Sequence, residues 1–272
     1  MTDVLVSERN LLSLRNYIKK FSLSPEKYKK HVFTELNEVA DEGNLFYFKG
    51  ERPKGLEFSF ADGVVNCHIF IGENVKSVNT TISVLSRNCL IYIGDRCNLK
   101  KSNISICGKR DALIIGNDVT LMPGNKWTTG HHSSIDEKMI IIGDDCIFSS
   151  SVTLRASDGR PLFSLDSGLQ VNEPLRPVII EPHCWIGQGA IILKNVKVGA
   201  CSIVSEGAVV TKSCRRYSLL TGVPAIRKNI EGMMWSRSQL EKDKEKARMW
   251  CSRYQPIKIP IYKKILDLIY KK

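Results

Sequence analysis

The chain of 272 residues contains no run of about eighteen apolar residues, the length that a membrane-spanning helix requires. Its first residues, Met1 to Val4, lack a basic region followed by an apolar stretch, so we expect no signal peptide. A glycine-rich phosphate loop and RNA- or DNA-binding motifs are also missing. The net charge of +12 and the sequence pI of about 9.3 nevertheless favour an acidic ligand. Since no recognition motif accompanies this charge, we expect no nucleic acid partner.

The nine cysteines include no CxxC pair, which disfavours a metal site. Cys97, Cys146 and Cys184 occupy a repeat position that Val75 and Val119 fill elsewhere, as small core residues would. We therefore expect reduced structural thiols, no metal and a cytoplasmic protein.

A period of six residues governs the stretch 178–211. An aliphatic residue stands at every sixth position: Ile180, Ile186, Ile192, Val198, Val204 and Val210. Four places after the first five of these come small or apolar residues: Cys184, Ala190, Val196, Ser202 and Ala208. An amphipathic helix repeats near 3.6 residues and a half-buried strand at two, so neither explains this period. It is typical of a parallel β-helix, in which each coil buries its aliphatic residues on those of the next.

A looser form of the same pattern begins earlier, at Ile71-Gly72, Ile93-Gly94, Ile115-Gly116 and Ile142-Gly143. The steps between these pairs are 22, 22 and 27 residues, which predicts coils with small insertions. The fold class is therefore mainly β, with a β-helix over 62–226. We expect an N-terminal helical cap region over 1–61 and a basic helical extension over 227–272.

Both ends of the chain leave alternatives open. Ser24-Pro25-Glu26 is a helix start, and the apolar residues that follow it up to Val39 predict a helix. That region either caps the open end of the solenoid or serves acceptor binding or oligomerisation. Near the other end, 239–253 is a predicted charged helix, and 256–272 contains a short basic amphipathic helix. The latter either contacts an anionic membrane or packs on a β-helix.

The stretch 178–211, continued by Gly222-Val223-Pro224-Ala225, resembles the hexapeptide-repeat acyltransferases, most closely the galactoside, xenobiotic and capsular-polysaccharide O-acetyltransferases. These enzymes have a turn similar to Ser-Asp-Gly-His-Pro, then a loop, then Val-Trp-Ile-Gly. The counterparts here are residues 157–161, 162–177 and 184–187. The resemblance implies a left-handed parallel β-helix, acetyl-CoA as acyl donor without a metal, and a homotrimer with each active site between neighbours.

Acyl transfer to a sugar hydroxyl needs a base for the hydroxyl proton and donors for the developing oxyanion. In the resembling enzymes the histidine of the turn is that base. Arg160 stands at its position here, and a guanidinium keeps its proton at physiological pH. One coil earlier, Thr129-Gly130-His131-His132 repeats the turn pattern. We hypothesise that His131 or His132 is the base and that Arg160 binds a carboxylate or phosphate of the acceptor. Asp158 orients a histidine, contacts the sugar or only forms the turn.

The resemblance also implies a binding site for acceptor and cofactor. Trp185 lies between the inward Cys184 and Ile186 of the coil pattern and should point outward, where it either packs on another subunit or, as a tryptophan does in the resembling enzymes, forms a wall of the acceptor or pantetheine site. Other implied contacts to CoA are the backbone at Gln188 and Ala208, and side chains near the phosphates: Thr211, Lys212, Arg227 and Lys228.

Three functions remain open on the sequence alone. The first is an O-acetyltransferase that acts on an acidic glycan or lipid-linked saccharide of a bacterial surface (capsular) polysaccharide, on the inner face of the membrane. The second is a catalytically inactive hexapeptide-repeat protein that binds or scaffolds. The third is a zinc enzyme of the same fold, but His131, His132 and His183 lack the spacing for a shared metal.

Overall fold

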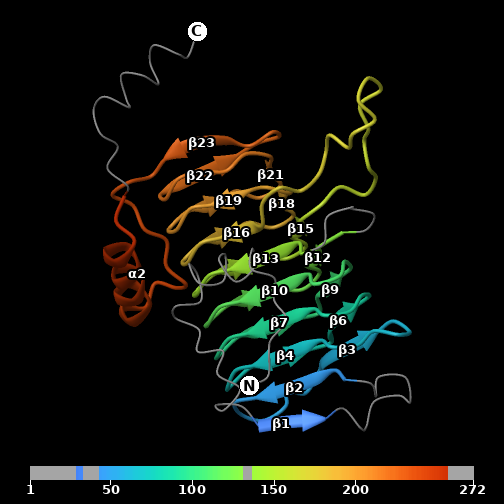
Figure 1. Ribbon diagram of the computed structural model, residues 1–272. Coiled ribbons are helices and arrows are strands. Elements are labelled where there is room, and N and C mark those ends of the chain that lie inside the picture. Colours follow the sequence, from blue (N-terminus) through green and yellow to red (C-terminus); the bar gives the residue numbers. More distant parts are fainter. Residues whose placement is uncertain (1–28, 33–42, 131–136, 257–272) are drawn as a thin grey trace.

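The computed structural model describes residues 29–32, 43–130 and 137–256, which form a three-sided parallel β-solenoid (Figure 1). Sheet A contains β1 (Lys29–Val32), β2 (Leu45–Phe48), β4 (His68–Ile71), β7 (Leu90–Ile93), β10 (Ala112–Ile115), β13 (Met139–Ile142), β16 (Val178–Ile180) and β19 (Lys197–Val198). Sheet C contains β5 (Lys76–Val78), β8 (Asn98–Lys100), β11 (Thr120–Leu121), β14 (Ile147–Phe148), β17 (Trp185–Ile186), β20 (Ile203–Val204), β22 (Ser218–Thr221) and β23 (Ile226–Asn229). Sheet B contains β3 (Leu56–Phe60), β6 (Thr80–Val84), β9 (Asn103–Ile106), β12 (Lys126–Thr128), β15 (Thr153–Arg155), β18 (Ile191–Ile192) and β21 (Val209–Val210).

The six-residue period explains this architecture. The chain passes through sheets A, C and B in turn, and each successive aliphatic residue enters the core from the next sheet. Ile180, Ile186 and Ile192 each have 0% of their surface exposed. Parallel pairing joins Ile71 to Ile93, and each later marker to the next, up to Ile180 and Val198. The predicted parallel β-helix and its coil steps are confirmed.

The glycine that follows each marker isoleucine is required by the close approach of neighbouring coils. A Cβ atom built on Gly94 would lie 2.6 Å from the carbonyl carbon of Gly116 on the next coil. Side chains larger than hydrogen therefore cannot occupy this corner without moving the backbone. The Ile-Gly pairs in the sequence reflect this packing.

The N-terminal helix prediction is wrong where the structure describes it. Residues 29–32 form strand β1, which pairs antiparallel with β2, and β2 pairs in parallel with β4. Pairing to the edge of sheet A outweighs the local helical signal there. Parallel pairing extends from β2 to β22, and β23 adds to the edge of sheet C as the antiparallel partner of β22. The other residues of the predicted cap, 1–28 and 33–42, lie outside the described part of the chain.

Sheet A differs from the other two sheets because it is buried on both faces. Its inward residues join the main core, and its outward residues form a second apolar cluster that includes Tyr47, Phe70 and Ile114. On sheets B and C the outward residues are mostly half-buried or exposed. The accessible faces of the solenoid are therefore those of sheets B and C.

After β23 the chain forms helix α2 (Glu241–Arg253), which confirms the predicted charged helix. None of the described helical residues forms a segment long and apolar enough to cross a membrane. Ala247 and Trp250 are buried on α2, which lies beside the corner between sheets A and C (Figure 1). Residues 257–272, where a basic amphipathic helix was predicted, lie outside the described residues.

The corner between sheets A and C is a column of residues in the left-handed backbone region, one per coil. They are Asn74, Arg96, Asp118, Asp145, His183, Cys201 and Tyr217, with φ between 56° and 59°. The C-terminal segment docks on this column. Trp235 stacks on His183 with ring centroids 4.3 Å apart, and its Nε1 donates to the His183 carbonyl (3.0 Å).

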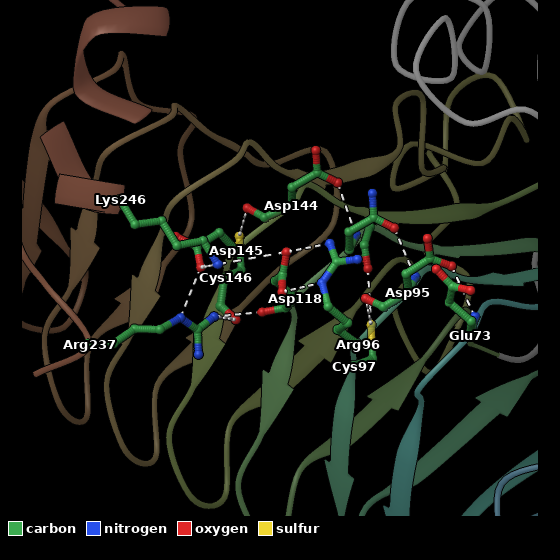
Figure 2. A network of polar contacts seen from close by, with 12 residues as sticks. Glu73, Asp95, Arg96, Cys97, Asp118, Asp144, Asp145, Cys146, Arg237 and Lys246 are labelled. Atoms are coloured by element: carbon green, nitrogen blue, oxygen red, sulfur yellow. Dashed lines mark hydrogen bonds and ion pairs between the residues drawn. The ribbon is translucent and has the colours of Figure 1, made fainter. Parts of the chain in front are cut away.

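Asp145 is the centre of this docking (Figure 2). Its Oδ1 lies 2.9 Å from Arg237 Nε and 3.0 Å from Lys246 Nζ, and its Oδ2 lies 2.8 Å from His183 Nδ1. Burial alone would raise the pKa of Asp145, but the hydrogen bond from His183 and the charges of Arg237 and Lys246 lower it below its usual value. His183 is thus part of the contact that holds the C-terminal segment on the solenoid.

Most thiols of the chain are core residues, as predicted. Six of the nine cysteines are buried, among them Cys97, Cys146 and Cys184. Burial raises the pKa of Cys97 to about 12. Cys251 on α2 differs, because a hydrogen bond with Cys201 lowers its pKa to about 6. Burial therefore makes Cys97 and Cys184 poor nucleophiles.

Candidate functional site

The predicted site residues fall into two groups on different faces of the chain. One group lies on sheet C and includes Trp185 and Gln188. The other lies at the corner where the chain leaves sheet B for sheet A, and it includes Asp158 and Lys212. A whole sheet B separates them within one chain, so one chain does not bring Trp185 and Asp158 together.

The sheet C group surrounds a pocket of about 460 Å³. Its lining comes from four consecutive coils: Ser149, Trp185, Gly187, Gln188, Ile203, Val204, Ser205, Glu206 and Leu219. Trp185 is 42% exposed, as its outward repeat position predicted, and its Nε1 donates to Ser149 Oγ (3.3 Å). Pockets of a few hundred Å³ with apolar walls and a few polar groups are typical of small-molecule sites.

The outward row of sheet C continues from this pocket to a basic end. Trp185 pairs with Ile203, Ile203 with Leu219, and Leu219 with Lys228 of β23. Beside it, Arg227 donates from Nε to Ser218 Oγ (2.6 Å). The structure therefore brings four predicted residues, Trp185, Gln188, Arg227 and Lys228, to one region of sheet C.

The backbone groups proposed for pantetheine are partly engaged within the solenoid. The Ala208 amide donates to Ser205 O (3.2 Å), and its carbonyl accepts from the Ile191 amide (2.9 Å). The Ala208 residue is fully buried. The Gln188 carbonyl accepts from the Gly207 amide (2.9 Å). Ala208 is therefore a core residue first, and Gln188 is the more accessible of the two.

The second group starts from the register of sheet B. Thr128 pairs with Arg155, and a Cβ built on Gly130 would overlap Ser157 Oγ, so Gly130 stands against Ser157. The similarity of the two turn motifs instead aligns Gly130 with Gly159, two residues further along. In this register Ser157 lies beside Gly130, and the residue that follows Ser157 is Asp158, not Arg160. His131 and His132 themselves lie outside the described residues.

Asp158 and Arg160 open the long loop that leaves the solenoid after β15. Lys194 of a later coil forms an ion pair with Asp158 Oδ2, and Asn172 Nδ2 donates to the same oxygen (2.8 Å). The Arg160 side chain is exposed and donates to the Gly159 carbonyl (3.2 Å). Thr211 and Lys212 are exposed directly after β21, at the same corner.

Sequence reasoning missed Lys194, Asn172 and Ser149. Lys194 occupies an ordinary turn position of the six-residue repeat, and Asn172 lies in a loop without a period. The residue pairs form only when coils far apart in sequence stack, so no local signal identifies them. Within the described residues, no group of three or more histidine, cysteine or acidic residues has the arrangement of a metal site.

Comparisons with known proteins agree with this fold. The family described as bacterial transferase hexapeptide (six repeats) matches residues 177–212. The chain is 30% identical over 147 residues to a polysialic acid O-acetyltransferase of Escherichia coli O1:K1 / APEC, which covers 50% of this chain and 46% of that protein. The chain spans about half the length of the relatives that it matches in sequence.

Two solved structures share the fold over most of their length. The polySia-specific acetyltransferase NeuO superposes with a TM-score of 0.68 at 24% identity, covering 80% of this chain and 91% of that chain. The polysialic acid O-acetyltransferase OatWY superposes with a TM-score of 0.54 at 24% identity, covering 74% and 99%. Residues 177–212 therefore match the bacterial transferase hexapeptide (six repeats) family, in a chain that is similar in sequence and in fold to polysialic acid O-acetyltransferases.

Proposed function

We propose that this chain transfers an acetyl group from acetyl-CoA to a hydroxyl of a bacterial surface (capsular) polysaccharide or its precursor. The observation that carries the proposal is the sequence similarity to a polysialic acid O-acetyltransferase, together with the shared solenoid. The pocket beside Trp185 supports a narrow, largely apolar ligand such as the pantetheine arm of CoA. Lys228 and Arg227 at the end of the same row are suited to its phosphates.

The reaction that we propose is direct. A neutral imidazole of His131 or His132 takes the proton of the acceptor hydroxyl. At the same time the hydroxyl oxygen bonds to the carbonyl carbon of the thioester. The tetrahedral intermediate then collapses, the C–S bond breaks, and the CoA sulfur receives the proton. Asp158 belongs to this proposal as the carboxylate that orients the imidazole, and the register of Gly130 against Ser157 supports this role.

Charge supports an anionic acceptor at the corner that follows sheet B. Arg160 is exposed there, and Lys212 follows one coil beyond Lys194. The chain as a whole carries a net charge of +12. A guanidinium in this position is suited to a carboxylate or phosphate of an acidic glycan or a lipid-linked saccharide.

From the same resemblance we propose left-handed winding and a homotrimer with the active site between neighbours. The separation of Trp185 from Asp158 within one chain supports this assembly, because a second copy can bring the two faces together. Equilibrium sedimentation tests it, and a monomer that is active at nanomolar concentration would contradict it.

We also propose that the protein is cytoplasmic and meets the inner face of the membrane through 256–272. That segment combines an apolar stripe with several lysines, a composition that favours anionic lipid surfaces. Deleting it should abolish binding to anionic vesicles and leave binding to neutral vesicles unchanged. Equal binding of the full and shortened chains would contradict this proposal.

Thiol release from acetyl-CoA with a panel of glycans tests the function itself. We expect release with acidic capsular glycans and little with neutral ones. Trp185→Ala should lower kcat/KM by about tenfold or more, because it removes a wall of the pocket, whereas Trp185→Phe should keep most of the rate.

The competing function is an inactive hexapeptide-repeat protein, and Arg160 in place of the usual turn histidine favours it. Binding of an acidic glycan without any thiol release would establish that function instead.

A further inference from the structure

The loop between β15 and β16 is the largest excursion from the solenoid (Figure 1). The pairing of Ile142 with Ile180 shows that this coil contains 38 residues, against 18 between Ile180 and Val198. Side chains along the loop are exposed, including Leu165 at 103% and Leu169 at 69%. With so few apolar contacts of its own, the base of the loop has to be fixed by polar bonds.

Asn172 joins the outgoing and returning arms of this loop. Its Oδ1 accepts from the Leu162 amide (2.8 Å) and from Gln170 Nε2 (3.1 Å). Its Nδ2 donates to the Arg160 carbonyl (2.9 Å) and to Asp158 Oδ2 (2.8 Å). One amide side chain thus uses both its donor hydrogens and its acceptor oxygen across the loop base.

Lys194 fastens the same base to the next coil of the solenoid. Its ammonium donates to Asp158 Oδ2 and to the Asn172 carbonyl, and its side chain is only 19% exposed. An ion pair in such partial burial, with both acceptors in place, is more strongly ordered than a pair of free surface side chains.

The bonding of Asp158 is one-sided. Both of its described bonds end on Oδ2, and within the described ranges no hydrogen bond reaches Oδ1. The Asp158 side chain is 46% exposed, so this second oxygen is accessible to a ligand or to a neighbouring side chain. The carboxylate is therefore held in orientation by one oxygen while the other stays available.

We propose that Asn172 and Lys194 are positioning residues, which orient the Asp158 carboxylate and the Arg160 backbone at the corner where the acyl acceptor is bound. This inference rests on the proposed function and adds two residues to it. It assigns them to the acceptor side of the reaction, because the Trp185 pocket proposed for CoA lies on another sheet.

Hydrogen–deuterium exchange tests whether Asn172 and Lys194 fix the base of the loop, and it needs no enzymatic activity. In Asn172→Ala and Lys194→Met we expect the amides of Leu162 and Val171 to exchange about tenfold faster or more, because both donate within the loop base. Asn103→Ala and Lys100→Met, on exposed or half-buried strand positions elsewhere, are the matched controls and should leave these amides unchanged. Unchanged exchange in the two test variants would overturn the proposal.

Kinetics separate positioning from a merely structural role. Asn172→Ala and Lys194→Met should lower kcat/KM for the acceptor by about tenfold and leave KM for acetyl-CoA within about twofold. Lys194→Arg keeps the charge and should recover part of the loss. A rise of about tenfold in KM for acetyl-CoA, or no loss of kcat/KM for the acceptor, would contradict the proposal. If the wild-type protein acetylates nothing, the proposed function fails. The exchange result alone then shows whether Asn172 and Lys194 order the base of the loop.

Discussion

His131→Ala and His132→Ala are made singly, and the variant that lacks the general base is expected to have a kcat about 10²–10⁴-fold lower. The affected variant should keep KM for acetyl-CoA close to the wild-type value, because the base acts on the acceptor proton. The rate of the wild-type protein should rise with pH through about 6.5, the ordinary pKa of histidine, since only the neutral imidazole accepts the proton. The residual rate of the variant should lose this rise.

His68→Gln is the control for this experiment, because His68 lies on strand β4, away from the corner of Gly130 and Asp158. Circular dichroism and thermal unfolding of all three variants show whether the fold persists. Full activity in both alanine variants would exclude a histidine base in the paired turn. Asp158 would then be the next group to test.

Asp145→Asn is expected to give the largest loss of stability among single substitutions in the column of left-handed residues between sheets A and C. Asparagine is well suited to the φ of 57° at this position, so the change removes charge without adding backbone strain. Removing one partner of a buried ion pair typically costs about 3–5 kcal/mol, and partial exposure of Arg237 and Lys246 reduces the expected loss to about 2–3 kcal/mol. Thermal unfolding should show a decrease of about 5–10 °C in Tm.

The pH dependence of this effect has a definite sign. Because the folded-state pKa of Asp145 is lowered, its stabilisation is present above the unfolded pKa of about 3.9 and is lost as the pH falls through the lower folded value. The difference in Tm between the wild type and Asp145→Asn should therefore narrow below about pH 4. Exchange of the α2 amides should also increase in the variant, since Lys246 of α2 loses the closer of its two carboxylate partners.

Asp118→Asn is the matched control, with a φ of 59° in the same column. Its carboxylate is more exposed, at 24%, and pairs with Arg96 (2.9 Å) and more distantly with Lys246 (3.7 Å). The expected loss is below about 1 kcal/mol, as for other surface pairs. Equal losses from the two substitutions would show that Asp145 is not the centre of the C-terminal docking.

The solenoid was predictable because its determinants are local and repeated. Ile180 and Val198 bury against each other in register, and the spacing that records this contact is visible in the sequence. The same logic placed Trp185 on the outer surface. Each coil buries its inward residues against those of the next coil. This requirement explains both the coil steps and the inward cysteines.

Other features depend on contacts that have no period. Strand β1 forms because β2 offers a sheet edge, although the flanking residues carry a helical pattern. Asn172 and Lys194 meet only after a long loop returns to the solenoid. The match of Gly130 with Gly159 was mistaken because motif similarity does not record the pairing of Thr128 with Arg155.

The most direct test of the proposed reaction is a crystal structure of the protein with CoA and the position of the CoA sulfur in it. We predict that the sulfur lies within about 4 Å of an imidazole of His131 or His132, at hydrogen-bond or near-attack range. Trp185 should then be found beside the pantetheine arm. A sulfur bound far from both imidazoles would contradict the mechanism and favour a glycan-binding protein without catalysis.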